Sequence, residues 1–147
     1  MRFPPPLVFA GFAVLGVILE YVVGPIPVAS RTWIGIVGIA FLIAGFATAA
    51  SAVLEFQRTG QDPKPWSPTP EMVFKGPYRY TRNPMYVGLT AIQLGLGLLL
   101  DYLWISVLAP VALLVVHRIA VVPEERYLAE KFGSSFTDYC RRVRRYL

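Results

Sequence analysis

Four long apolar runs limit what this chain can fold into, because each is about as long as a membrane-spanning helix. A hydrocarbon core of roughly 30 Å needs about 20 apolar residues in an α-helix. Hydrophobic residues make up 55% of the sequence, a larger share than an ordinary soluble fold contains. We therefore predict an all-α, polytopic membrane protein with four transmembrane helices. The expected spans are residues 7–23, 33–54, 84–100 and 103–122.

The positive charges predict how these spans are oriented. Lys and Arg gather in the polar loop, residues 55–83, and in the tail, residues 123–147, whereas the two opposite turns carry only Arg31 and Asp101. Loops rich in Lys and Arg stay on the cytoplasmic side. We expect one integral-membrane domain with both termini and the long loop in the cytoplasm, a helical cytoplasmic tail, and a prokaryotic inner membrane as its location.

The net charge of +5 indicates which partners to expect. The cations lie next to apolar spans, and the sequence has no nucleic-acid-binding motif. Anionic lipid headgroups therefore explain the charge better than nucleic acid does. Cys140 is the only cysteine and His117 the only histidine, which excludes an internal disulfide, a zinc site of several thiolates and a histidine-rich metal site. The sequence does not indicate the oligomeric state.

Small and polar residues within the spans predict how the helices pack. Gly45 and Ala49 are four residues apart, as are Ala40 and Ala44, so one face of the second span is small enough for close packing. Gln93 places an amide at bilayer depth, where it needs a partner. The turn at 101–102 is so tight that the last two spans must form an antiparallel hairpin. We expect a break or a new helix start at position 123, which is a proline.

The stretch Gly76–Tyr86 concentrates arginines and tyrosines immediately before the third span. Pro84 suits the first turn of a helix, and Asn83 before it can cap that turn through its side chain. A helix N-terminus beside Arg79 and Arg82 is suited to bind a carboxylate or a phosphate. The alternative is a basic loop that orients the protein and touches lipid headgroups.

A pair of acids, Glu124 and Glu125, follows the fourth span. The predicted hairpin places Arg82 and Glu125 at adjacent helix ends on one membrane face. Adjacent helical residues point about 100° apart, so at most one of the two acids is expected to face a site. Two acids in the first turn of a helix are also favoured by the helix dipole alone.

Three motifs in this order resemble the isoprenylcysteine carboxyl methyltransferase and phospholipid methyltransferase family of integral-membrane enzymes. They are Gly-Pro-Tyr-Arg-Tyr-Thr-Arg-Asn-Pro-Met-Tyr-Val-Gly at 76–88, Glu-Glu-Arg-Tyr-Leu at 124–128, and Phe132-Gly133 followed by 139–144. The resemblance covers the chain from about Trp66 to its end. The family pattern usually reads Arg-His-Pro-x-Tyr, and this chain has Asn83 at the histidine position. Asparagine can form hydrogen bonds but cannot take a proton.

The resemblance implies a methyltransferase that uses S-adenosylmethionine. A glutamate can hold the ammonium or a ribose hydroxyl of this cofactor, Arg82 or a helix N-terminus its carboxylate, and a tyrosine ring its adenine or sulfonium. Glycine at position 88 would let the ligand approach the backbone. The implied cofactor-binding residues are Tyr78, Arg79, Arg82, Asn83, Pro84, Tyr86, Gly88, Glu124 and Glu125.

The expected acceptor is a lipid or another lipophilic or small molecule that enters from the bilayer. An isoprenylcysteine carboxylate needs no base, whereas a phospholipid amine or a thiol can use one. Glu125 and His117 are the nearby candidates for such a base, and Arg82 completes the set of candidate catalytic residues. Two alternatives are an NADPH-dependent membrane reductase of the sterol-reductase type and a non-enzymatic scaffold whose basic tail binds lipid. The acid pair argues against the reductase, because acids repel a dinucleotide phosphate.

Overall fold

The computed structural model describes residues 4–60 and 72–147, and within these ranges the chain is helical and has no β-strand. The all-α prediction is confirmed. Part of the predicted loop, residues 61–71, lies outside the described residues. The elements are α1 (Pro5–Val22), α2 (Arg31–Arg58), the 3-10 turn η1 (Gly76–Arg79), α3 (Pro84–Leu100), α4 (Leu103–Val116), the π-helical turn η2 (His117–Val121), α5 (Val122–Phe132) and α6 (Ser134–Arg142).

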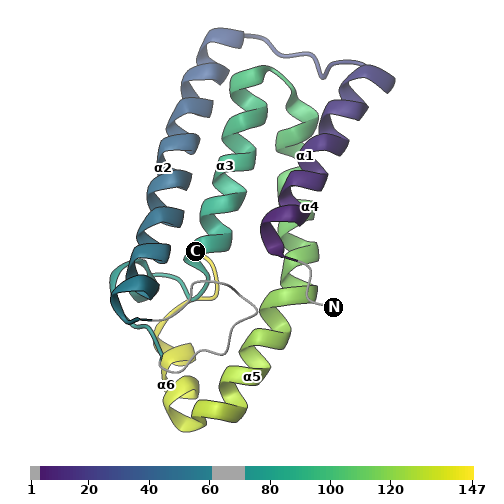
Figure 1. Ribbon diagram of the computed structural model, residues 1–147. Helices are drawn as coiled ribbons and strands as arrows, with labels where there is room; N and C mark the ends of the chain where they lie inside the picture. The colour runs from purple at the N-terminus through teal and green to yellow at the C-terminus, as the bar shows by residue number, and fades with distance from the viewer. Residues whose placement is uncertain (1–3, 61–71) are drawn as a thin grey trace.

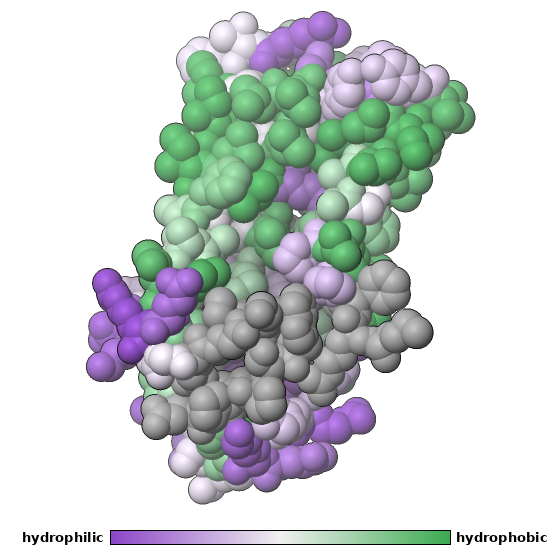
Figure 2. All heavy atoms as spheres, viewed as in Figure 1, coloured by the Kyte–Doolittle hydropathy of each residue, from purple (hydrophilic) through white to green (hydrophobic). Residues whose placement is uncertain are grey.

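The helices α1 to α4 run alternately up and down in one bundle (Figure 1). α2 packs on α3, α3 on α4, and α4 on α1, so the first two helices in sequence lie at opposite sides of the bundle. α5 and α6 continue beyond one end of it. Figure 2 shows apolar side chains over much of the bundle surface and hydrophilic ones gathered toward its two ends.

Three helical segments are long and apolar enough to cross a membrane: Pro5–Val22, Arg31–Arg58 and Leu103–Phe132. α3 is apolar too but has only 17 residues. α2 continues to Arg58, beyond the predicted end of its span at residue 54. These lengths and compositions fit an integral membrane protein.

Glycines bring α2 and α3 into backbone contact. A Cβ on Gly45 would lie 2.8 Å from the Gly88 carbonyl oxygen, and one on Gly38 would lie 2.9 Å from the Gly95 carbonyl oxygen. The two contacts are seven residues apart on each helix, as expected for antiparallel helices in close contact. The small face predicted around Gly45 is confirmed. The predicted Ala40–Ala44 face is instead exposed.

The hairpin of α3 and α4 is confirmed, with its turn at Asp101. This residue has φ +60°, a left-handed conformation that ends α3 within one residue. The Gln93 Nε2 donates a hydrogen bond to the Ile105 carbonyl oxygen at 3.1 Å, whereas its Oε1 is buried without a partner among the described residues. Ser106 Oγ donates to the Leu94 carbonyl oxygen at 2.8 Å. These two bonds link α3 to α4 and fix the register of the hairpin.

Pro123 lies at the start of α5, as predicted, but it does not break the chain's helical course. The backbone is helical at Val121 and Val122, and residues 103–132 form one continuous helix. The wider π-helical turn ends at Val121, two residues before the proline. Proline lacks an N–H and its ring crowds the carbonyl of the preceding turn, so a locally widened turn accommodates it. α5 thereby extends the line of α4 out of the bundle (Figure 1).

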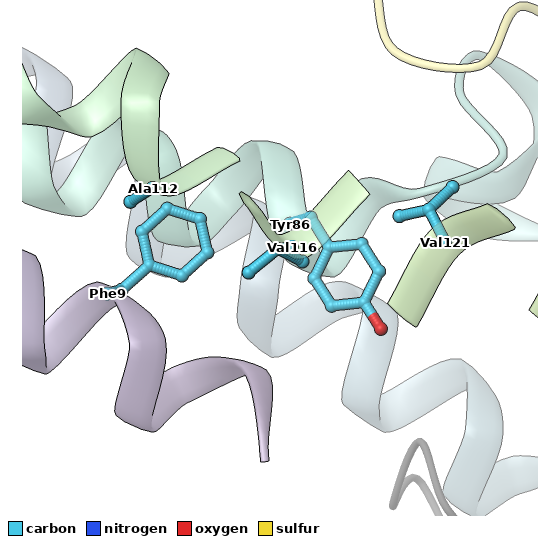
Figure 3. Close-up of a cluster of buried hydrophobic side chains, with 5 residues drawn as sticks. All are labelled: Phe9, Tyr86, Ala112, Val116 and Val121. Carbon is cyan, nitrogen blue, oxygen red and sulfur yellow. The ribbon is translucent and has the colours of Figure 1, made fainter. Parts of the chain in front are cut away.

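A buried cluster joins three of the helices just inside this end of the bundle (Figure 3). It contains Phe9 of α1, Tyr86 of α3, Ala112 and Val116 of α4, and Val121 of η2. Figure 3 shows the Tyr86 ring beside Val116, with its hydroxyl pointing away from Phe9 and Ala112. The cluster fixes the start of α3 against the turn from which α5 begins.

We predict that Gly45→Ala destabilises the bundle, because the added methyl group would stand 2.8 Å from the α3 backbone. Overpacking of this kind costs about 1–3 kcal/mol. Gly35→Ala is the matched control, since it is on the same helix and nothing lies within 4 Å of the place that its methyl group would take. Thermal unfolding in detergent should show a lower midpoint for Gly45→Ala alone. Equal midpoints for the two variants would contradict the close contact.

Candidate functional site

The stretch before α3 and the acid pair of α5 meet in an ion pair. Arg82 Nη1 lies 3.0 Å from Glu125 Oε1, and the two side chains are only 13% and 17% exposed. Arg145 binds the same carboxylate with two contacts, from Nε to Oε1 at 3.0 Å and from Nη2 to Oε2 at 2.7 Å. The predicted approach of Arg82 and Glu125 is confirmed. One carboxylate is therefore held between two guanidinium groups.

The tail segment, residues 143–147, is bound along the stretch that precedes α3. The Arg82 amide donates to the Arg144 carbonyl oxygen at 2.9 Å. Thr81 Oγ1 and Asn83 Nδ2 each donate to the Arg145 carbonyl oxygen at 3.0 Å. The end of α6 is thus carried back to the foot of α3, where Figure 1 shows the C-terminus.

Asn83 occupies the predicted N-cap position of α3, but its side chain makes no capping hydrogen bond. The predicted side-chain cap is wrong. The amide instead donates to the tail, and the Asn83 carbonyl accepts from the Val87 amide at 3.1 Å. Pro84 follows at the first helical position and is buried. The Asn83 side chain thus bonds to Arg145, which is distant in the sequence, instead of to the first turn of its own helix.

His117 is also in contact with the tail segment. Its Nδ1 lies 2.8 Å from the Tyr146 hydroxyl and shares a hydrogen bond with it. His117 is the first residue of η2, about two helical turns before the acids, and it is half-buried. Burial raises the pKa of the Tyr146 phenol, which the charge of Arg145 partly offsets. His117 and Glu125, the two candidate bases, thus contact adjacent residues of the tail segment, Tyr146 and Arg145.

Tyr78 is buried at the side of the site that faces α2. Its ring packs edge-on against Phe56 with centroids 5.5 Å apart, and its carbonyl oxygen accepts from the Tyr139 hydroxyl at 2.8 Å. Burial raises the pKa of Tyr78, and the carboxylate of Glu124 raises it further. Burial also raises the pKa of Tyr139 to about 12. Both phenols are therefore neutral hydrogen-bond donors at physiological pH.

The second acid, Glu124, lies on the side of the tyrosines. The carboxylate is within hydrogen-bonding reach of the Tyr86 phenol and close enough to Tyr78 to act on its ionisation. Glu124 and Glu125 therefore have different surroundings, one aromatic and the other formed by two guanidiniums. This agrees with the expectation that adjacent acids on a helix point apart.

Two predicted residues are placed differently from the rest. Arg79 is exposed at the end of η1. Gly88 is buried, and a Cβ there would lie 2.9 Å from both the Ala49 Cβ and the Ala49 amide nitrogen. The sequence predicted that a ligand approaches the backbone at Gly88. In the structure α2 makes a close approach there, and it fills the space that a side chain at position 88 would take.

Arg145, Thr81 and Tyr146 contact the candidate residues, although sequence reasoning did not single them out. Thr81 lies within the motif at 76–88, and that position is a signal that could have found it. The arginines of the tail are equally consistent with lipid-binding charges, and nothing in the sequence separates Arg145 from Arg144. Arg145 and Arg144 are distinguished only by the path of the chain after α6, which brings the Arg145 side chain to Glu125.

The assembled groups suit a ligand that carries both charge signs. Guanidiniums bind carboxylates and phosphates, and glutamates bind ammonium groups. Within the part of the chain that the structure describes, Arg82 Nε is buried and has no hydrogen-bond partner. A buried donor of this kind is normally satisfied, so it indicates a place for an acceptor. In the same ranges no group of three or more His, Cys, Asp or Glu residues could hold a metal ion.

Comparison with known proteins identifies the family. The model of the phospholipid methyltransferase family matches residues 33–135, from the start of α2 to the start of α6. The match begins earlier than the resemblance seen in the motifs, and it ends before the tail segment. No curated protein and no solved structure matches the chain. The family match covers more than half of the sequence, and the chain belongs to the phospholipid methyltransferase family.

Proposed function

We propose that this protein is a membrane methyltransferase that uses S-adenosylmethionine and modifies a lipophilic or small acceptor. The observation that carries the proposal is the 3.0 Å contact between Arg82 and Glu125, which joins the start of α3 to α5 at one end of an apolar bundle. Membership of the phospholipid methyltransferase family supports the reaction class. The cofactor and the site residues are our inference from the chemistry of the assembled side chains.

The donor set fits the cofactor's amino-acid portion. That portion carries a carboxylate and an ammonium, and the site provides Arg82 for the first and the acid pair for the second. Arg82 Nε is a buried donor without a partner among the described residues. Glu124 lies near the phenol groups of Tyr78 and Tyr86, so an adenine or a sulfonium bound beside this acid would also lie near aromatic side chains. Neither Arg79, which is exposed, nor Gly88, which packs on α2, is needed for this arrangement.

The bound cofactor supplies an activated methyl group, so the protein needs to align and desolvate the reactants more than to provide a nucleophile. Arg82 and Glu125 are held rigidly, since each is mostly buried and each has a charged partner. His117 lies on the same end of the bundle and can move a proton through Nε2, because Nδ1 is bound to Tyr146. A carboxylate acceptor requires no such transfer, whereas an amine or a thiol would use it.

We further propose that α3 is a fourth membrane span and that the site lies on the cytoplasmic side. α3 has 17 residues, a length of about 26 Å, which is slightly less than the hydrocarbon core. It lies between α2 and α4, and neighbouring helices can cover the shortfall. Reporters fused after residue 58 and after residue 147 should both be active as cytoplasmic fusions, and a reporter in the turn at 101–102 should not. The opposite pattern would reverse the orientation.

The reaction itself is testable with a cofactor whose methyl group is labelled. Purified protein in lipid nanodiscs should transfer label to material that partitions into organic solvent, and calorimetry in detergent should detect binding of the demethylated cofactor. NADPH added in excess should not compete. Folded protein that neither binds the demethylated product nor transfers label would reject the proposal. The identity of the labelled lipid would reveal the acceptor class.

Glu125→Gln should weaken binding of the demethylated cofactor by roughly tenfold or more, because it removes the charge that holds Arg82 and Arg145. Glu130→Gln is the matched control, since it makes the same change at an exposed position of the same helix. Thermal midpoints of both variants separate loss of binding from loss of folding. Unchanged affinity in folded Glu125→Gln would remove Glu125 from the site.

A further inference from the structure

We propose that Arg145 is a positioning residue that orients Glu125 for ligand binding, and that Asn83 acts on the site by fixing Arg145. The inference rests on the proposed function, because it concerns how the same site is held. Arg145 lies outside the residues that match the family model, which end at 135. Its role therefore follows from the contacts of this chain alone.

Arg145 holds the Glu125 carboxylate in a more defined orientation than Arg82 does. Arg145 contacts both carboxylate oxygens, whereas Arg82 contacts only Oε1. A contact to both oxygens fixes the plane of the carboxylate as well as its position, which a single contact does not. With three acceptor positions used out of about four, the remaining one on Oε2 has a defined direction. A ligand ammonium would meet a carboxylate that is already oriented.

The backbone of Arg145 is itself held in place by hydrogen bonds. Its backbone carbonyl accepts two hydrogen bonds, from Thr81 Oγ1 and from Asn83 Nδ2, each at 3.0 Å. The preceding carbonyl accepts from the Arg82 amide at 2.9 Å. On its other side, Tyr146 is held by His117. The residue is thus fixed by its backbone, and its side chain need not be ordered again when a ligand binds.

Asn83, which occupies the position where the family pattern usually has histidine, is linked to Glu125 through Arg145. Its side chain donates to the Arg145 carbonyl, and Arg145 in turn holds Glu125. Asn83 therefore influences the acid through two successive contacts, and without exchanging a proton. An aspartate at this position would have the same size but would place an acceptor against the Arg145 carbonyl, which repels it.

The experiment compares two neighbouring arginines. Arg145→Gln removes the contact to Glu125, and Arg144→Gln makes the same charge change on an exposed side chain. We expect Arg145→Gln to raise the Kd for the demethylated cofactor roughly tenfold to a hundredfold, since it deletes charge-assisted hydrogen bonds. Arg144→Gln should stay within about twofold of the wild type. Arg145→Lys should recover part of the loss, because lysine keeps the charge but not the two-point contact.

Hydrogen exchange at the Arg82 amide distinguishes orientation of Glu125 from release of the tail segment. Arg145→Gln should keep this amide protected, because the bond to the Arg144 carbonyl does not involve the altered side chain. Asn83→Asp should lower both the protection and the affinity. Loss of protection in Arg145→Gln to the same extent as in Asn83→Asp would show that the side chain only holds the tail, and would overturn the positioning role.

The affinities separate this inference from the proposed function. If the wild type binds the demethylated cofactor and both Arg145→Gln and Arg144→Gln bind it equally well, the inference is overturned and the proposed function is unaffected. Tighter binding by Arg145→Gln also overturns it, because Arg145 would then compete with the ligand for Glu125. Absence of binding by the folded wild type overturns the proposed function and the inference together.

Discussion

The ion pair between Arg82 and Glu125 is the contact on which the arrangement of this end of the molecule depends. Both side chains are mostly buried, so each charge needs the other to compensate for lost hydration. Glu125 would keep Arg145 as a partner if Arg82 were removed, whereas removal of Glu125 would deprive both guanidinium groups of their shared carboxylate. The contact also fixes the start of α3 relative to α5. The separation of Arg82 and Glu125 therefore determines the geometry of any ligand site at this end of the bundle.

Two features of the bundle bring the pair together. Glycine contacts such as that between Gly45 and Gly88 hold α3 directly against α2 and so fix the height at which α3 begins. The π-helical turn before Pro123 lets the helix of α4 continue into α5, which carries the acids beyond the bundle. A full break at the proline would have left α5 free to lie elsewhere. Helix packing and one irregular turn thus position the charges.

The apolar runs were sufficient to predict the helices, and the tight turn at Asp101 was sufficient to predict that Arg82 and Glu125 meet. The sequence could not show that the Asn83 side chain prefers the Arg145 carbonyl to the backbone of its own helix, because both partners suit an amide. Nor could it show what approaches Gly88, since a glycine permits a ligand and a helix equally. Arg145 differs from Arg144 only through the course of the chain after α6.

The charges around Glu125 also bear on the alternatives to a methyltransferase. A scaffold that binds lipid through a basic tail would need only exposed arginines such as Arg141 and Arg142, and burial of Arg82 against Glu125 would add nothing to it. A dinucleotide phosphate would be attracted by the arginines but opposed by the two acids beside them. The carboxylate of an amino-acid zwitterion can pair with the arginines while its ammonium pairs with an acid. The mixed charges of this site therefore favour a zwitterionic ligand of the kind that we propose.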